Sequence, residues 1–284
     1  MKEFDKLWNY NDPAATETKF KELLPDYIAA TDLSGHLQLL TQIARTYSLR
    51  RMFDDAHATL NEVQAQLPEA TDVAHIRYYL ERGRTFNSSG KKAEANEQFV
   101  LAKNTAIELK EDFYAIDAVH MLAIAAPADE AIKLNEAGVV LAEQSIQERA
   151  KNWLGALYNN LGWAYFDKGE YDKALSIFLR ALQWREEKKS APEIFLAKWC
   201  VARTLRALNR LDEALKIQLA LLEEMVEADN HDGYVYEELG EIYLLKNEEV
   251  YKMYFGFAHT HLGKDIWLSA NEAPRLERLL QLSK

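Results

Sequence analysis

Apolar residues recur along the chain at intervals of three and four, in stretches of helical length that short polar segments separate. The clearest pair of stretches carries Leu161 and Tyr165 on the first and Phe178 and Ala181 on the second. Residues three and four apart share one face of an α-helix, so each stretch predicts an amphipathic helix. The polar segment 167–170 between them predicts a tight turn, in which Gly169 is free to take a positive φ.

Small residues mark the point where two such helices approach each other. Gly162 lies within the first stretch and Ala174 within the second, and the absence of bulk at both positions predicts a close antiparallel crossing. The pattern recurs with Ala or Tyr in the slot of Ala174, at Ala56, Ala95, Ala131, Ala174, Ala214 and Tyr251. Successive positions are 39, 36, 43, 40 and 37 residues apart. The chain therefore predicts about six helix pairs over residues 36–262.

The ends of the chain depart from this pattern in a way that suits capping helices. Residues 1–35 contain Asp12-Pro13, a helix N-cap followed by a first-position proline, and residues 263–284 contain an apolar stripe ending at Leu282. Repeat arrays need atypical ends to cover their exposed apolar edges. Because no segment is typical of a flexible linker, we predict one all-α domain over residues 1–284.

The spacing Tyr158-x2-Leu161-Gly162-x2-Tyr165, followed by Ala174-x3-Phe178, resembles the tetratricopeptide repeat superfamily. More narrowly, stretches such as Asn159-Asn160-Leu161-Gly162-Trp163 resemble a widespread group of uncharacterised bacterial tetratricopeptide repeat proteins. The superfamily resemblance implies a right-handed α-α superhelix, in which the first helix of each pair lines a concave groove. It also implies that this groove binds peptides or partner proteins.

Composition and net charge argue against some classes of function. Glycine and proline together make up only 17 of 284 residues, and 34 Lys+Arg stand against 45 Asp+Glu, a net charge of −11. An acidic chain is poorly suited to nucleic acid or to anionic membranes. Cys200 is the single cysteine, no leader-like or membrane-length apolar run occurs, and we therefore expect a cytoplasmic protein.

The helical period identifies the side chains that would face the groove. Once Gly162 and its equivalents are set against the second helix, the opposite face of each first helix carries polar and aromatic residues. The candidate ligand-binding residues are Arg45, Arg77, Glu81, Arg84, Asn87, Asp117, His120, Asn159, Asn160, Trp163, Trp199, Arg203, Arg206, Glu237 and Glu241. An acidic protein thus gathers five arginines on one predicted face.

Two interpretations of these arginines stay open. Arginine holds carboxylates bidentately and asparagine bonds the peptide backbone, so the groove suits an anionic segment or a free C-terminus. Alternatively the charges pair internally: Glu81 with Arg84, or Arg203 and Arg206 with Glu237, Glu238 and Glu241. Trp163 and Trp199 are equally compatible with anchoring a ligand and with ordinary packing.

No pattern in the sequence indicates catalysis, a metal site or a cofactor. Nucleotide-binding glycine loops, nucleophile elbows and zinc-helix motifs are absent, although Asp117, His120 and Arg84 would form an acid–base group if they converged. We therefore expect a non-enzymatic scaffold that binds a protein or peptide partner. The alternative is an intracellular sensor that binds a small metabolite or signalling peptide.

Overall fold

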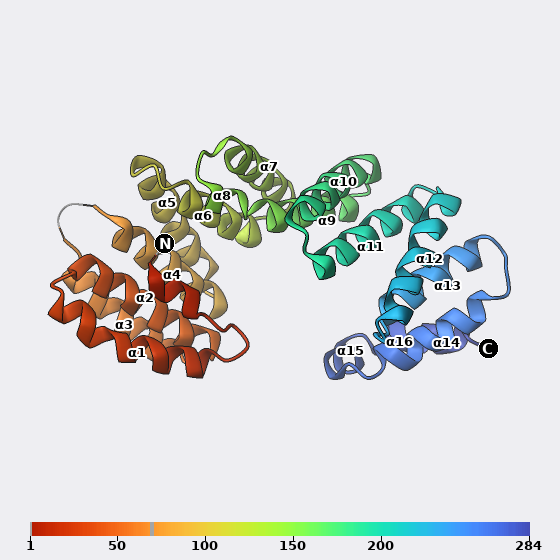
Figure 1. Ribbon diagram of the computed structural model, residues 1–284, viewed down its shortest axis with the longest axis horizontal. Coiled ribbons are helices and arrows are strands. Elements are labelled where there is room, and N and C mark those ends of the chain that lie inside the picture. The colour runs from red at the N-terminus through yellow and green to blue at the C-terminus, as the bar shows by residue number, and fades with distance from the viewer. Residues whose placement is uncertain (1, 69–70) are drawn as a thin grey trace. The chain divides into compact units, whose positions relative to one another are not determined.

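The computed structural model describes residues 2–68 and 71–284, and it is built from α-helices joined by short turns (Figure 1). Contacts divide the chain into two compact units, Met1–Leu157 and Tyr158–Lys284. The helices are η1 Glu3–Leu7, α1 Pro13–Ala29, α2 Leu33–Leu49, α3 Phe53–Gln66, α4 Val73–Ser88, α5 Lys92–Glu108, α6 Asp112–Ala125, α7 Ala128–Gln144, α8 Glu148–Lys151, α9 Leu154–Asp167, α10 Tyr171–Lys188, α11 Ala191–Ala207, α12 Leu211–Glu227, α13 Gly233–Leu245, α14 Tyr251–Leu262, α15 Ile266–Asn271 and α16 Ala273–Leu282. The predicted all-α class is confirmed.

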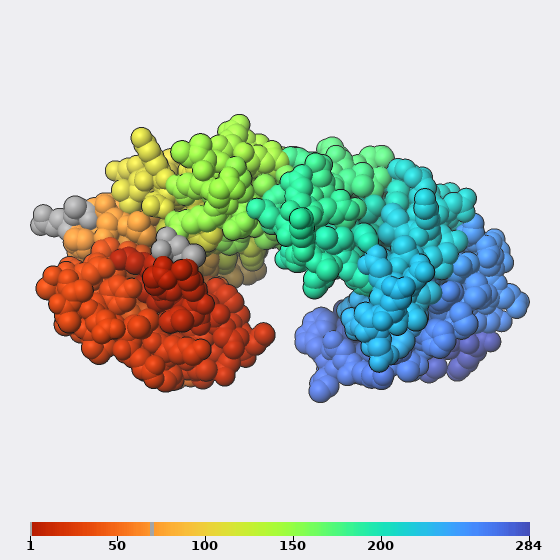
Figure 2. All heavy atoms as spheres, in the orientation of Figure 1, coloured from red at the N-terminus to blue at the C-terminus, as the bar shows by residue number. Residues whose placement is uncertain are grey.

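Consecutive helices pack in pairs, as the repeat pattern predicts: α2 with α3, α4 with α5, α6 with α7, α11 with α12, and α13 with α14. The single-domain prediction for residues 1–284 stays a prediction. Within each unit, side chains close the gaps that the ribbon leaves between neighbouring helices (Figure 2). No helix among residues 2–68 and 71–284 combines the length and the apolar character needed to cross a membrane.

Local sequence explains where the helices begin and turn. Asp12, Asp32, Asp72 and Asp232 each accept a hydrogen bond from a backbone N–H of the first helical turn, and this satisfies a donor that the helix itself leaves unpaired. Gly169 has φ +78° in the turn between α9 and α10, as its position in the sequence predicts.

Three pairs, α4–α5, α9–α10 and α13–α14, cross where an aromatic ring lies against a glycine. A Cβ atom on Gly162 would stand 2.5 Å from the ring of Phe178, and one on Gly83 would stand 2.5 Å from Phe99. Gly240 faces Phe255 in the same way, at 2.8 Å. These contacts confirm the predicted register and bring the backbones of paired helices closer than any larger residue would allow.

The terminal segments pack on the ends of their own units. In the first unit, Phe4 of η1 and Phe20 of α1 are fully buried against Leu37 and Leu40 of α2. In the second unit, Leu268 of α15 and Leu279 of α16 join the core that Phe255 of α14 forms. The ends of the chain therefore bring their own side chains to the repeat surfaces that they cover.

The crossing makes a stability prediction. Gly162→Ala is expected to lower the free energy of unfolding by about 1–3 kcal/mol, because the Phe178 ring has to move away from the new methyl group. Gly256→Ala in α14 is the matched control, since its Cβ would meet only Ser283, at 3.7 Å. There the better helix propensity of alanine should raise stability by up to about 1 kcal/mol. Urea denaturation of both variants measures the difference, and equal stabilities would contradict the assigned crossing.

Candidate functional site

In the first unit, the predicted inner residues of α2, α4 and α6 form a chain of ion pairs. Arg45 donates to Glu81 at 3.1 Å, and Arg84 donates to the same carboxylate at 2.6 Å. Arg84 also pairs with Asp117 on α6. Partners on neighbouring first helices lie about one repeat apart in sequence, so the ion pairs tie successive repeats together.

Burial and charge act in opposite directions on this chain of pairs. Glu81 is only 3% exposed, and burial alone would raise the pKa of its carboxyl. Arg84 and Arg45 outweigh burial and hold the pKa of Glu81 below its usual value. Burial likewise disfavours the charged form of Arg84, but Asp117 and Glu81 keep its pKa above the usual value. Glu81 and Arg84 are therefore both charged at neutral pH.

Arg77 is held from a different direction. It pairs with Asp5 of the N-terminal helix η1, and its guanidinium lies 5.2 Å from the ring centre of Phe4 and 5.6 Å from that of Tyr114. Trp8 donates its indole N–H to Gln42 of α2 at 3.0 Å. The N-terminal segment thus covers part of the predicted ligand-binding face.

These residues enclose a cavity of about 300 Å³ within the first unit, which we call the arginine cavity. Its lining is Asp5, Trp8, Tyr10, Gln42, Arg45, Arg77, Leu80, Glu81, Arg84, Phe113, Tyr114, Asp117, Arg149, Asn152 and Trp153. Five of the sequence-predicted site residues are brought together here: Arg45, Arg77, Glu81, Arg84 and Asp117.

The repeat pattern of the sequence did not predict several of the lining residues, because they lie outside the repeats. Asp5, Trp8 and Tyr10 come from the N-terminal segment, and Arg149 comes from α8 between two pairs. Arg149 bonds Glu111 at 2.8 Å, and its guanidinium is 4.6 Å from the ring centre of Phe113. The 38-residue separation of Arg149 and Glu111 is close to the repeat spacing, which is the signal that could have identified the pair.

Other predicted residues lie outside the lining of the arginine cavity. Asn87 is half-buried near the end of α4, and Asn159 and Asn160 are half-buried on α9. The His120 ring lies 5.2 Å from that of Trp153. Burial lowers the pKa of His120, with Asp117 opposing the shift and Arg84 adding to it. The neutral imidazole is therefore favoured at neutral pH.

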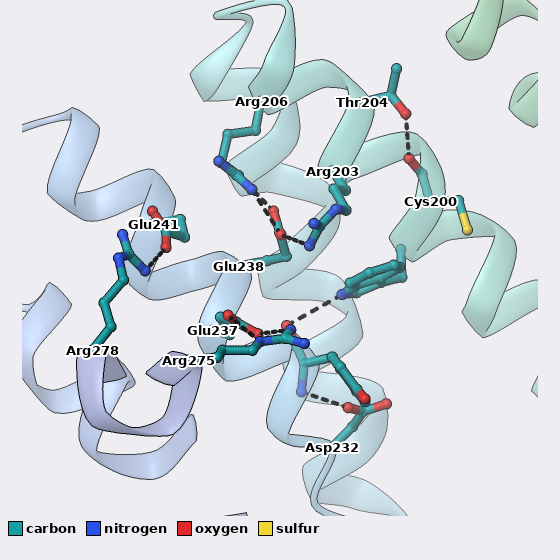
Figure 3. Close-up of polar contacts among 12 residues, drawn as sticks. Cys200, Arg203, Thr204, Arg206, Asp232, Glu237, Glu238, Glu241, Arg275 and Arg278 are labelled. Atoms are coloured by element: carbon teal, nitrogen blue, oxygen red, sulfur yellow. Dashed lines mark hydrogen bonds and ion pairs between the residues drawn. The ribbon is translucent and has the colours of Figure 1, made fainter. Parts of the chain in front are cut away.

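In the second unit the inner charges neutralise one another. Arg203 and Arg206 of α11 both bond Glu238 of α13, at 2.8 and 2.7 Å, and Glu238 is only 1% exposed (Figure 3). Arg275 and Arg278 of the C-terminal helix α16 pair with Glu237 and Glu241 (Figure 3). Internal pairing, one of the two interpretations from the sequence, therefore accounts for every predicted charge in this unit.

Trp163 and Trp199 belong to a row of packed rings. Their ring centres are 6.1 Å apart, and Trp199 is 6.0 Å from Tyr234. The indole N–H of Trp199 donates to the carbonyl of Tyr234 at 3.3 Å, and the Arg203 guanidinium lies 5.3 Å from the Trp199 ring centre. Both tryptophans thus pack around a paired arginine.

The single thiol is shielded. Cys200 is buried, and burial raises its pKa to about 12, although Arg185 and Arg203 act in the opposite direction. Such a thiol is almost entirely protonated at neutral pH and is a poor nucleophile. Across residues 2–68 and 71–284, no group of three or more His, Cys, Asp or Glu is placed to hold a metal ion.

Comparison with known proteins shows a repeat fold. The tetratricopeptide repeat profile matches residues 155–188, which span the α9–α10 pair. The structure is similar to the apo form of RapI, with TM-score 0.74 and 14% identity over 93% of this chain and 76% of that one. It is also similar to a signal-transduction ATPase with a tetratricopeptide repeat sensor from Pyrococcus horikoshii, with TM-score 0.73 and 15% identity over 94% of this chain and 43% of that one.

A third similar structure is the C-terminal part of a tetratricopeptide repeat-containing protein from Cytophaga hutchinsonii. It has TM-score 0.60 and 15% identity over 98% of both chains. A comparison with curated protein sequences finds no significant match. At these identities the structural likeness supports the fold and leaves the residues of the site to be argued from their own geometry.

The paired glutamate of the second unit gives a testable prediction. Glu238→Gln removes the charge that two arginines share, and we expect it to lower the free energy of unfolding by about 1–3 kcal/mol. Glu213→Gln, which alters an exposed pair with Arg210, should leave stability unchanged. Urea denaturation distinguishes the two variants, and a Glu238→Gln protein as stable as the parent would contradict a structural role for the pairing.

Proposed function

We propose that this chain, a member of the tetratricopeptide repeat superfamily, is a protein-interaction scaffold whose first unit holds an anionic or C-terminal peptide segment of its partner. The observation that carries the proposal is the arginine cavity on the predicted ligand-binding face. The tetratricopeptide repeat fold supports protein interaction in general. The peptide chemistry and the location in the first unit are our proposal.

The charge of the cavity favours an anionic ligand. Its lining carries four arginines against the three carboxylates of Asp5, Glu81 and Asp117, although the whole chain has a net charge of −11. A local positive surface attracts anions, while the acidic remainder of the protein repels the other parts of an acidic partner. Arginine adds directional recognition, because its planar fork matches a carboxylate.

The second unit is less suited to this role. Its inner arginines share Glu238, and its inner glutamates pair with Arg275 and Arg278. The arginines of the first unit are paired as well, and what distinguishes that unit is the arginine cavity that they line. We therefore propose that the second unit contributes rigidity and that the anionic segment enters the first.

A sensor is the second candidate, and the size of the cavity favours it. About 300 Å³ lies at the lower end of the range for small-molecule sites. The similar Pyrococcus horikoshii protein carries a tetratricopeptide repeat sensor, which is compatible with this alternative. In either case we propose a non-catalytic protein that acts in the cytoplasm.

A selection experiment tests the peptide proposal. Random octapeptides with free C-termini are selected on the full chain, and the enriched peptide is labelled and titrated by fluorescence anisotropy. We expect Arg45→Gln to weaken its binding about tenfold or more, the equivalent of one charge-assisted hydrogen bond. Arg45 is the suitable position because Arg84 still neutralises Glu81 when Arg45 is lost.

Arg206→Gln is the matched control. Arg206 is also on the inner face, its side chain is 20% exposed against 21% for Arg45, and it too shares its glutamate with a second arginine. The control should bind the selected peptide like the parent protein. Enrichment of cationic peptides, or a loss of binding in Arg206→Gln but not in Arg45→Gln, would refute the proposal.

A further inference from the structure

Two buried donors of the arginine cavity have no hydrogen-bond partner among the described residues. They are Nη1 of Arg77 and the indole Nε1 of Trp153, and both residues line the cavity. Arg77 is only 6% exposed and uses Nη2 to hold Asp5. Buried donors are normally satisfied, so two unpartnered donors in one small cavity call for an acceptor there.

The charge of the lining limits what that acceptor is. Asp5 holds Arg77, while Glu81 and Asp117 hold Arg84 and Arg45. Four arginines and three carboxylates leave an excess of one positive charge in the lining. The fourth arginine, Arg149, pairs with Glu111, which lies outside the lining and is partly exposed. With Glu111 counted, every arginine of the lining already has a carboxylate partner, so a singly charged acceptor is favoured over a dianion such as phosphate.

The remaining walls are aromatic. Trp8, Tyr10, Phe113, Tyr114 and Trp153 surround the charged groups, and Trp8 stacks on Tyr10 with ring centres 4.7 Å apart. A flat apolar group gains contact area against such walls. A volume of about 300 Å³ accommodates one such group with its carboxylate and excludes a long stretch of peptide.

We propose that the arginine cavity recognises a single carboxylate attached to a planar apolar group, with Arg77 Nη1 and Trp153 Nε1 as the donors. The inference rests on the proposed function and deepens it, since the C-terminal residue of a peptide ending in an aromatic side chain has this chemistry. A free aromatic acid has it too. The ligand enters end-on, and its acceptor oxygens satisfy the two unpartnered donors.

Calorimetric titration of the full chain tests the assignment with three probes: N-acetyl-L-phenylalanine, its C-terminal amide and inorganic phosphate. The acid should bind at least about tenfold more tightly than the amide, because only the acid carries a negative charge. Phosphate should bind more weakly than the acid. Equal binding of acid and amide, tighter binding of phosphate, or no binding of the acid at millimolar concentration would each overturn the inference.

A variant locates the contact. Trp153→Phe keeps an aromatic ring and removes the indole donor. It should therefore weaken the binding of the acid severalfold and leave the binding of the amide unchanged. Trp199→Phe in the second unit is the matched control and should change neither. Unaltered acid binding in Trp153→Phe would refute the assigned donor. The comparison of acid and amide on the parent protein decides the carboxylate question even if this variant does not fold.

A final pair of probes distinguishes a peptide C-terminus from a free aromatic acid as the ligand. It also tests this inference independently of the proposed function. An octapeptide ending in phenylalanine is titrated with a free and with an amidated C-terminus. Binding of the free form alone supports recognition of a peptide end, whereas binding of N-acetyl-L-phenylalanine alone supports a small acid and contradicts the peptide function. If the selected peptide requires Arg45 but tolerates amidation, the proposed function stands and the end-on inference fails.

Discussion

The packing of helices in pairs is the constraint on which the other features depend. In three of the pairs, Gly83, Gly162 and Gly240 receive a phenylalanine ring from the second helix, at distances where an added Cβ atom would force the ring to move. Because the two helices of a pair pack together, the first helix turns a defined face away from its partner. Residues on that face of one repeat then meet those of the next, and arginines and carboxylates about one repeat apart become neighbours.

This arrangement makes the terminal segments part of the charged surface. Asp5 reaches Arg77 from the N-terminal end, and Arg275 and Arg278 reach Glu237 and Glu241 from the C-terminal end. Both units pair their inner charges, and each has a buried arginine nitrogen without a partner among the described residues, Arg77 Nη1 in the first and Arg203 Nε in the second. In the first unit, Arg77 and Trp153, which both have such a donor, line one cavity together with aromatic rings. That cavity is why we assign the ligand to the first unit.

The repeat register could be predicted from sequence because it follows from local helical periodicity and small residues at fixed spacing. The crossing at Gly162, where the ring of Phe178 lies against the first helix, is an example. The pairing of Arg203 and Arg206 was one of two interpretations, since periodicity places a residue on a face without choosing its partner. Asp5, Trp8 and Arg149 were missed because their positions depend on how non-repeating segments fold back onto the repeats.

The location of the ligand can be measured directly, because the chain has six tryptophans and their indole N–H groups give separate NMR signals. Trp8 and Trp153 line the arginine cavity, and Trp163 and Trp199 belong to the second unit. In a titration of ¹⁵N-labelled protein with the selected peptide, we predict shifts at Trp8 and Trp153 and constant signals at Trp163 and Trp199. Shifts confined to Trp163 and Trp199 would contradict a binding site in the first unit.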